Sequence, residues 1–311
     1  MPPAFPARFL SIADLDRSAL VACLDLAASM KAARSARQPH DRPLEGLHVA
    51  LLFEKPSLRT RSTFEIAVHE LGGHVIEPPQ DVALGGRETI EDVARNLERW
   101  VAAAVVRTYA QARIMEFADA APRLRVVNAL TNEEHPCQAL ADCLTLVERW
   151  GSLEGRTLAF VGDGNNVATS LAQAGVMLGA RVRVISPAGF ELPQRVRDSI
   201  TRLAASGGAL EVVSDPAQGV RGADAVYTDV WTSMGQESEA TARDAVFQPY
   251  QVNGALMARA EPGALFMHCL PAHRGEEVTD EVIDSPASVV FDQAENRLHV
   301  QKALLALLTR R

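Results

Sequence analysis

Two short segments of the chain carry side chains suited to group-transfer chemistry. One runs from Ser57 to Arg61, after an apolar stretch and before a helical pattern, and the other ends an apolar stretch with His268 and Cys269. Free N–H groups at a helix start, hydroxyls and guanidinium groups favour a phosphate. A thiol beside an imidazole can act as a nucleophile or accept a proton, although a buried, unreactive thiol is the simpler alternative. If both segments serve one site, it brings an anion to a nucleophile.

In the phosphate segment, Ser57 and Thr60 offer hydroxyl donors. Arg59 and Arg61 are two residues apart, so on a helix they point about 200° away from each other. We therefore expect Arg59 to bind the ligand and Arg61 to form a structural ion pair, with Glu65 one turn further on as its partner. An ordinary capped helix with surface arginines is the alternative. The segment has no glycine-rich phosphate loop, so a nucleoside triphosphate is not indicated.

A second polar turn, His135-Pro136-Cys137-Gln138, leads into a helix in which Pro136 suits the first position. His135 and Gln138 can then face the same side. An imidazole can donate to a carbonyl oxygen and an amide can donate and accept, so the pair could hold a small amide, or His135 could simply cap its helix. Cys137 is expected to pack in the core.

The turn Gly162-x-Gly164 follows a strand but lacks the third glycine and the later acidic residue of a dinucleotide fingerprint, which disfavours a dehydrogenase. Asn165 and Asn166 lie where open sheets bind ligands, or serve only as turn formers. Asp229 ends another strand and could bind a cation or amine.

Two further segments leave alternatives open. Residues 229–237 contain a Ser-Met-Gly sequence and read either as a lid that excludes water or as a solvated loop. Arg297 opens the last helix and could donate to a ligand carbonyl or pair with Glu295.

The composition is that of a globular protein without a nucleic-acid partner. The chain has 311 residues, 47% apolar and 23% charged, with net charge −8 and no basic tract. Its four cysteines have no paired spacing and indicate reduced thiols in a cytoplasmic protein. We expect no signal peptide and no membrane span.

The elements that would position these residues alternate between strands and helices. This alternation predicts an α/β fold with two doubly wound domains, each with a mostly parallel sheet flanked by helices, and an active site in the cleft between them. We place the first domain at 1–135, an interdomain helix at 136–149 and the second domain at 150–293. A closing helix within 294–311 is expected to pack back onto the first domain. Predicted strands include 289–291, and the first long helix is predicted over 14–37 with Asp14 as its cap.

Together and in this order, the motifs resemble the aspartate/ornithine carbamoyltransferase superfamily, from about Phe9 to Leu308. The Ser-Leu-Arg-Thr-Arg and His-Pro-Cys-Gln motifs mark the superfamily. The segments that begin at Asp229 and His268 look like its ornithine branch. The resemblance implies transfer of the carbamoyl group from carbamoyl phosphate to the δ-amine of L-ornithine, giving citrulline and phosphate in arginine biosynthesis. It implies neither a metal nor an organic cofactor.

The resemblance also implies residue roles. It gives Arg107, His135, Asp229 and Cys269 catalytic parts. The ornithine site would be formed by Asn166, Asp229, Ser233 and Met234. The carbamoyl phosphate site would be formed by Ser57, Leu58, Arg59, Thr60, Arg107, His135, Gln138, Cys269, Leu270 and Arg297.

The resemblance implies a homotrimer, or a multiple of trimers, whose sites are completed by a neighbouring subunit. Many relatives have a threonine at the position of Leu58 and a glutamine at the position of Ala83 in the segment that reaches the neighbour's phosphate site. We hypothesise that Arg87 supplies that contact here.

Two other functions compete. One is carbamoyl transfer to another amine, such as putrescine or an N-acylated ornithine, against which the 229–237 segment favours plain ornithine. The other is a non-catalytic relative that binds amino acids or a partner. Retention of Arg59, Arg107, His135, Asp229 and Cys269 argues against it.

Overall fold

The computed structural model describes residues 5–39, 41–80, 84–232 and 237–310. It divides the chain into two compact units, Met1–Leu144 with Glu295–Arg311, and Thr145–Ala294. The boundaries fall inside the helices α5 (Pro136–Trp150) and α12 (Val290–Thr309). Among the described residues, no helix is both long enough and apolar enough to cross a membrane.

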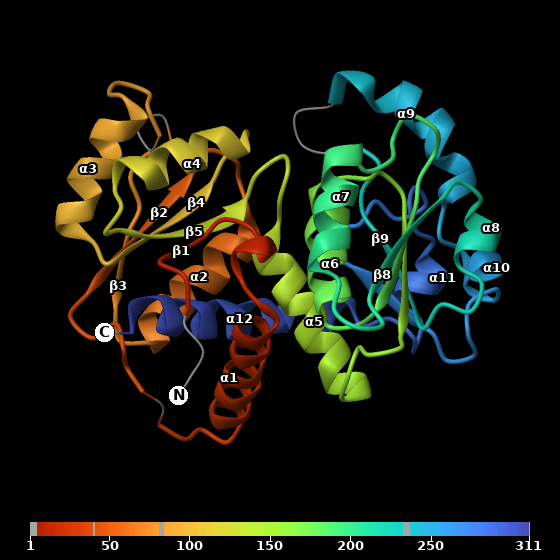
Figure 1. Ribbon diagram of the computed structural model, residues 1–311, viewed down its shortest axis with the longest axis horizontal. Coiled ribbons are helices and arrows are strands. Elements are labelled where there is room, and N and C mark those ends of the chain that lie inside the picture. Colours follow the sequence, from red (N-terminus) through yellow and green to blue (C-terminus); the bar gives the residue numbers. More distant parts are fainter. Residues whose placement is uncertain (1–4, 40, 81–83, 233–236, 311) are drawn as a thin grey trace. The chain divides into compact units, whose positions relative to one another are not determined.

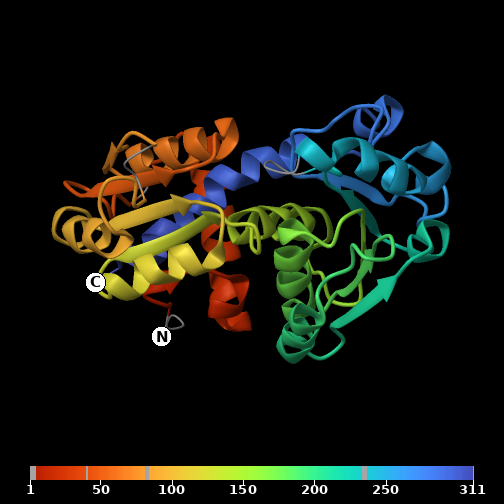
Figure 2. The ribbon, with the colours of Figure 1, turned by 90° about the horizontal axis from the view of Figure 1, so that it is seen from above.

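The first unit contains a five-stranded parallel sheet with the order β1-β5-β4-β2-β3. Figure 1 shows α3 and α4 over one face of this sheet and α1, α2 and α12 over the other, and Figure 2 gives the same layers from above. The elements other than α5 and α12 are β1 (Arg8–Phe9), η1 (Ile12–Asp14), α1 (Arg17–Ser35), β2 (His48–Phe53), α2 (Leu58–Glu70), β3 (His74–Ile76), α3 (Ile90–Trp100), β4 (Ala103–Arg107), α4 (Gln111–Ala120) and β5 (Arg125–Leu130).

The central strands of this sheet are buried on both faces, as expected for a parallel sheet covered by helices. Along β2, Ala50 and Leu52 join one core cluster with residues of α3 and α4, such as Leu97 and Phe117. Because alternate side chains point to opposite faces, Leu51 packs on the other side. The continuous apolar run of β2 is explained by this double burial.

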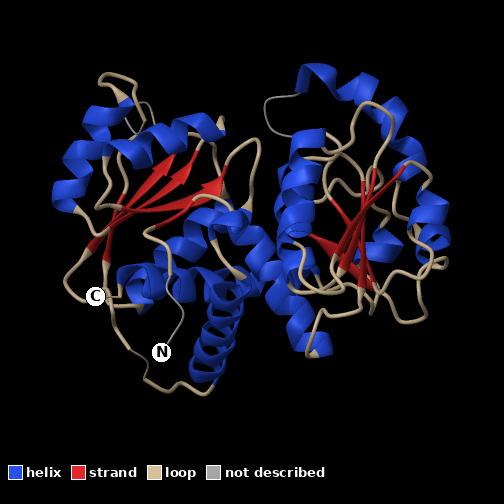
Figure 3. Cartoon of the chain, in the orientation of Figure 1, coloured by secondary structure: helices blue, strands red, loops and turns tan. Residues whose placement is uncertain are grey.

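The second unit has its own five-stranded parallel sheet, with the order β10-β9-β6-β7-β8. Figure 3 shows these strands enclosed by helices, and Figure 1 places α6 and α7 on one side and α8, α10 and α11 on the other. The elements are β6 (Thr157–Val161), α6 (Asn166–Met177), β7 (Arg181–Ile185), α7 (Gln194–Leu203), β8 (Ala209–Val213), α8 (Pro216–Gly219), β9 (Ala225–Thr228), η2 (Glu237–Glu239), α9 (Ala240–Phe247), η3 (Gln248–Tyr250), α10 (Gly254–Met257), β10 (Leu265–His268) and α11 (Asp280–Ile283).

The prediction of a fold with two parallel α/β sheets is therefore confirmed, but two local predictions are wrong. The cap of α1 is Asp16, whose carboxylate accepts from the N–H of Ala19, while Asp14 closes a capping box with Ser11 in the preceding turn. Residues 290–291 are the first helical residues of α12 rather than a strand. Only an isolated bridge at Ser288 pairs this region with β10 among the described residues, so the helix begins before a strand can form.

The Gly-x-Gly turn has a packing explanation that needs no dinucleotide. A Cβ atom on Gly164 would lie 2.4 Å from the backbone nitrogen of Leu192, so the close approach of this backbone admits only glycine. Gly162 has a φ of +138°, a conformation that other residues rarely adopt. Both glycines thus shape the end of β6, from which α6 starts.

Candidate active site

The phosphate segment forms the N-terminus of α2. Ser57 is the cap, and its hydroxyl accepts from the N–H of Thr60 at 3.2 Å. The helix therefore begins at Leu58 and points its positive dipole end at this loop. The Leu58 side chain is 79% exposed, whereas Thr60 is buried and Arg59 is half-buried.

Arg61 forms an ion pair, but not with the partner that the spacing predicted. Its Nη2 atom lies 2.7 Å from the carboxylate of Glu77, just after β3, and not beside Glu65. β3 pairs with β2, so the sheet brings Glu77 to the helix that follows β2. Arg61 thus belongs to the scaffold, in agreement with its predicted structural role.

Arg107 ends β4 beside the phosphate segment. Phe53, the last residue of β2, is its register partner, so the ends of two neighbouring strands bring the arginine to the loop. The arginine is 5% exposed. Lys55 is buried next to it, donates to Asn132 at 2.6 Å and lies over the ring of Tyr109. Burial and, after it, the charge of Arg107 lower the pKa of Lys55.

A chain of hydrogen bonds joins α5, α12 and α2. The Nη1 atom of Arg297 donates to the amide oxygen of Gln138 at 2.8 Å, and its Nη2 donates to the Thr60 hydroxyl. All three side chains are almost fully buried. Arg297 thus contacts two other residues that are predicted for the carbamoyl phosphate site.

His135 precedes α5 and is 5% exposed. Burial, followed by the charges of Arg297, Arg107 and Arg59, holds the pKa of His135 well below its usual value of 6.5. The imidazole is therefore neutral near pH 7 and can donate one N–H without bringing a positive charge. Cys137, predicted as a packing residue, is buried; its thiol donates to the carbonyl of Asn128, and burial raises its pKa to about 12.

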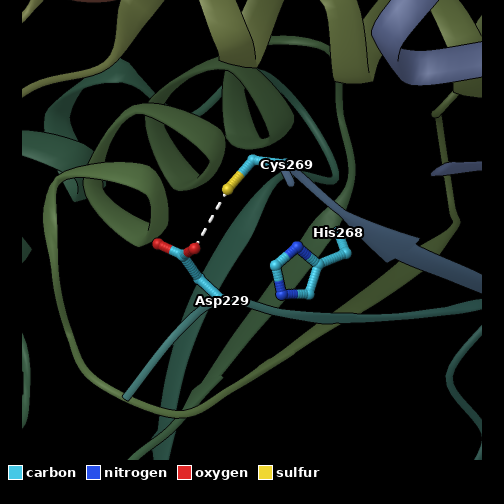
Figure 4. A group of neighbouring side chains, drawn as sticks. All are labelled: Asp229, His268 and Cys269. Carbon is cyan, nitrogen blue, oxygen red and sulfur yellow. Dashed lines mark hydrogen bonds between the residues drawn. The ribbon is translucent and has the colours of Figure 1, made fainter. Parts of the chain in front are cut away.

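In the second unit, residues that follow β9, β10 and β6 meet around the carboxylate of Asp229. The thiol of Cys269 donates to the carboxylate of Asp229 at 3.0 Å, which is the dashed line in Figure 4. The amide of Asn165 donates to the other oxygen of Asp229 at 2.8 Å. Asp229 is 8% exposed. This arrangement provides a carboxylate that can receive an amine or ammonium group.

His268 holds the turn that carries Cys269. Its Nδ1 atom accepts from the N–H of Leu270 at 2.8 Å, so the proton resides on Nε2, which faces the buried carboxylate of Glu277 at 3.1 Å. Leu270 has a φ of +58°, which this hydrogen bond helps to maintain. Ligand atoms of Asp229, His268 and Cys269 lie within 4.8 Å of one another, a spacing that suits a metal. Both ring nitrogens of His268 already have partners, so a cation would have to displace one.

Arg243 of α9 fastens two of these loops together. Its guanidinium donates to the carboxylate of Asp163, in the turn after β6, and to the carbonyl of Trp231 at 2.6 Å, two residues after Asp229. The rings of Phe190 and Phe247 lie 4.9 Å and 5.1 Å from it. Burial raises the pKa of Asp163, while Arg243 acts in the opposite direction.

The structure therefore gathers the predicted residues into a cationic group in the first unit and an acidic group in the second. Asn166 is the first residue of α6, and its neighbour Asn165, the cap, is the one whose amide bonds to Asp229. Ser233, Met234 and Ala83 lie outside the described residues, and Arg87 is exposed.

Sequence reasoning did not single out four other residues near these groups: Lys55, Asp142, Asp163 and Arg243. Asp142 alone had a local signal, since it lies one helical turn after Gln138.

Comparison with known proteins defines the class. Residues 8–148 match the model "Aspartate/ornithine carbamoyltransferase, carbamoyl-P binding domain", and residues 154–308 match "Aspartate/ornithine carbamoyltransferase, Asp/Orn binding domain". The chain belongs to the aspartate/ornithine carbamoyltransferase family.

The individual relatives and solved structures with high identity belong to the ornithine branch of this family. The ornithine carbamoyltransferase of Parafrankia sp. is 53% identical over 302 residues, which cover 96% of this chain and 95% of the relative. That of Thermococcus kodakarensis is 49% identical over 301 residues, covering 96% and 95%. The solved ornithine carbamoyltransferase from Pyrococcus furiosus superposes with a TM-score of 0.94 at 48% identity and covers 98% of both chains.

Proposed function

We propose that this protein is an ornithine carbamoyltransferase, which transfers the carbamoyl group of carbamoyl phosphate to the δ-amine of L-ornithine and releases citrulline and phosphate. The observation that carries the proposal is the buried group of Arg107, Arg297 and a neutral His135 beside the capped N-terminus of α2. Guanidinium groups and a helix N-terminus suit a phosphorylated donor. The relatives that share about half of their residues with this chain are named ornithine carbamoyltransferase.

In the first unit, Ser57, the Leu58 backbone, Arg59 and Thr60 bind the phosphate. Arg107 bridges the phosphate and the carbonyl oxygen, and His135 polarises that oxygen through its N–H. As the tetrahedral intermediate forms, this oxygen gains negative charge, which the buried donors stabilise. Losing one such donor typically costs about 2.7–4 kcal/mol in the transition state.

In the second unit, Asp229 and Cys269 receive the δ-amine, with Asn166, Ser233 and Met234 completing the ornithine site. An alkyl amine with a pKa near 10.4 is neutral in only about one molecule in 10³ at pH 7. The site must therefore bind the rare neutral form or pass the ammonium proton through Asp229 to water before attack. The nitrogen then bonds to the carbonyl carbon, and the C–O bond to phosphate breaks. The proton that the nitrogen loses in this step leaves with the phosphate as hydrogen phosphate, so no covalent enzyme intermediate is needed. The backbone of Cys269 and Leu270 contacts the carbamoyl group.

The test is citrulline formation by the full chain from carbamoyl phosphate, with ornithine varied and putrescine and N-acetylornithine as competing acceptors. We expect saturable citrulline formation and a kcat/KM for ornithine at least about 100-fold above that for either competitor, because a buried carboxylate and its neighbours must be matched by the acceptor. A rate equal to that of buffer alone would refute the proposal.

We propose further that the protein is cytoplasmic, serves arginine biosynthesis and assembles as a homotrimer or a multiple of trimers. Cys23, Cys137, Cys143 and Cys269 are free thiols in the structure, as suits a reducing compartment. A relative from Pyrococcus furiosus carries the name "Ornithine carbamoyltransferase, anabolic".

Arg87 is proposed to reach the phosphate site of a neighbouring copy. It is exposed, and it follows the stretch in which relatives place a glutamine. Arg87→Ala should raise the dissociation constant of carbamoyl phosphate about tenfold, the loss expected for one charge-assisted contact. Arg99→Ala is the control, since Arg99 is an exposed arginine of α3 that contacts the carbonyl of Arg95.

A mixing experiment tests whether the contact crosses between subunits. Assemblies reconstituted from Arg87→Ala and Arg107→Ala chains should regain activity, because some sites then receive both arginines from intact positions. Unchanged affinity in Arg87→Ala, or no recovery on mixing, would refute this role.

A further inference from the structure

The amide of Gln138 can be placed in the site in two ways that have nearly the same shape. Flipping it exchanges the oxygen, which accepts, with the NH2 group, which donates. Gln138 is fully buried, so its neighbours decide which group faces the bound carbamoyl group. A carbamoyl NH2 needs an acceptor, and only one of the two orientations provides it.

Two neighbours with opposite hydrogen-bonding character fix the orientation. The guanidinium of Arg297 has donors only and faces Oε1 of Gln138 at 2.8 Å. The carboxylate of Asp142, when ionised, has acceptors only and faces Nε2 at 2.8 Å. Asp142 lies one turn after Gln138 on α5, on the same face of the helix, and is fully buried. In the flipped orientation, the NH2 group of Gln138 would face the donors of Arg297, and its oxygen would face the acceptors of Asp142.

We propose that Asp142 is a positioning residue of the carbamoyl site, which holds the Gln138 amide with its oxygen toward Arg297 and toward the NH2 group of the carbamoyl donor. This inference rests on the proposed function, in which Gln138 contacts that NH2 group. Arg297 donates in the other direction as well, to the Thr60 hydroxyl. The Thr60 oxygen therefore accepts from Arg297, and its own proton remains available for another acceptor. Asp142 and Arg297 together thus fix the orientation of the Gln138 amide, one from each end.

Asp142 need not touch the substrate for this role, so its removal should affect the carbamoyl end of the ligand and spare the phosphate end. Most of the proposed phosphate grip, namely Ser57, the Leu58 backbone, Arg59 and Arg107, lies outside the hydrogen-bonded chain of Gln138, Arg297 and Thr60. Only Thr60 belongs to both, and Arg297 donates to it whichever way the amide points. Inorganic phosphate is therefore the internal reference, and the ratio of the two dissociation constants is the readout. A general loss of folding or packing would weaken both ligands together.

The experiment measures the dissociation constants of carbamoyl phosphate and inorganic phosphate by calorimetry on the full chain. Asp142→Leu, similar in size and without an acceptor, should weaken carbamoyl phosphate roughly 10- to 100-fold and leave phosphate unchanged within about twofold. Asp142→Asn keeps an oxygen that can accept from Nε2 and should restore most of the difference. Cys143→Ala is the matched control, because the thiol is equally buried on the same helix and is the next residue after Asp142.

A double-mutant cycle separates positioning from charge. In a Gln138→Ala background, Asp142→Leu should have no further effect on the ratio if Asp142 acts through the amide. A further loss in that background, or an unchanged ratio in Asp142→Leu itself, would overturn the proposal. A loss in Asp142→Asn as large as in Asp142→Leu would also overturn it, because the charge and not the acceptor would then matter.

If Asp142→Leu does not fold, Asp142→Ala carries the same expectation. A water molecule that fills the space left by the carboxylate both donates and accepts, so it does not favour one orientation of the amide. The proposed function has a separate criterion. If the wild-type chain makes citrulline and Asp142→Leu leaves the ratio of the two dissociation constants unchanged, only the positioning role is refuted. If the wild-type chain makes no citrulline, the proposed function itself is refuted.

Discussion

The two groups of site residues differ in charge and in the way they are held. In the first unit, Arg107 and Arg297 are 5% and 3% exposed, and hydrogen bonds tie Arg297 to two neighbouring helices. In the second unit, the central charge is the Asp229 carboxylate, which accepts from Asn165 and Cys269. One group suits an anion and the other suits a cation.

The difference follows from what each substrate requires. A phosphorylated donor arrives with its charge and keeps it, so fixed guanidinium groups can be built into the core in advance. An amine arrives protonated and must lose that proton, so its site needs a group that first attracts the ammonium ion and then tolerates the neutral amine. In the proposed ornithine site, the Asp229 carboxylate, with its thiol and amide donors, would meet both needs.

The donor group should therefore fail most severely when one of its buried cations is removed. Arg107→Ala should lower kcat/KM for carbamoyl phosphate about 10²- to 10³-fold, because the phosphate and the developing oxyanion both lose a donor. Steady-state citrulline formation at saturating ornithine measures it.

Arg61→Ala is the matched control for this loss. Arg61 lies in the phosphate segment, but its side chain is 57% exposed and pairs with Glu77. A surface ion pair contributes about 0–1 kcal/mol, so kcat/KM should change less than fivefold. Equal losses in the two variants would contradict the division of the segment into ligand and scaffold arginines.

The acceptor group should depend on how its loops are fastened. Arg243→Lys keeps a positive charge but cannot donate to Asp163 and Trp231 together, since an ammonium group lacks the planar fork. We expect the KM for ornithine to rise about tenfold, as for the loss of one charge-assisted hydrogen bond. The dissociation constant of carbamoyl phosphate should not change.

Steady-state kinetics with each substrate varied in turn separate the two effects. Arg259→Lys provides the control, because Arg259 is an exposed arginine of the same unit. A parallel loss for both substrates would mean that Arg243 supports the fold in general and not the position of Asp229.

The parts of the site that could be predicted from sequence are those with local signals. The helix that follows the apolar run of β2 has such a signal, and the structure places Ser57 as its cap. The ligand role of Ser57 stays a prediction. The ion pair of Arg61 was assigned to Glu65 because that residue is one turn away, whereas Glu77 reaches it through the pairing of β2 with β3. Spacing along a helix cannot report a partner that a sheet supplies.

Long-range contacts explain most of what was missed. Thr60 and Arg297 are 237 residues apart in sequence, and only tertiary structure joins them. Arg243 likewise meets Asp163 across 80 residues. The contact of Asn165 with Asp229 was also missed: Asn165 caps α6 through its side-chain oxygen and donates to Asp229 across 64 residues. The strand predicted at 289–291 failed because apolar residues open α12 as readily as they would fill a strand.

The smallest effect is expected for the pH dependence of carbamoyl phosphate binding at His135. Burial and the charges of Arg297, Arg107 and Arg59 hold the pKa of His135 well below its usual value of 6.5, so we expect a neutral imidazole in the folded protein between pH 6 and pH 8. Its contribution to carbamoyl phosphate binding should then be independent of pH in that range. We expect the ratio of the dissociation constants of His135→Gln and wild type to stay constant within about twofold, since glutamine also donates a neutral N–H.

The pH dependence of turnover should instead come from the acceptor. At pH values below the pKa of the amine, its neutral fraction grows tenfold for each unit by which the pH rises. In both proteins, log kcat/KM for ornithine should therefore rise with a slope of about 1 between pH 6 and pH 8. A sigmoidal change in the ratio of carbamoyl phosphate affinities near pH 6.5 would mean that His135 is protonated in the free enzyme. The donor group would then titrate as well, and the contrast between a fixed cationic site and a proton-exchanging acidic site would fail.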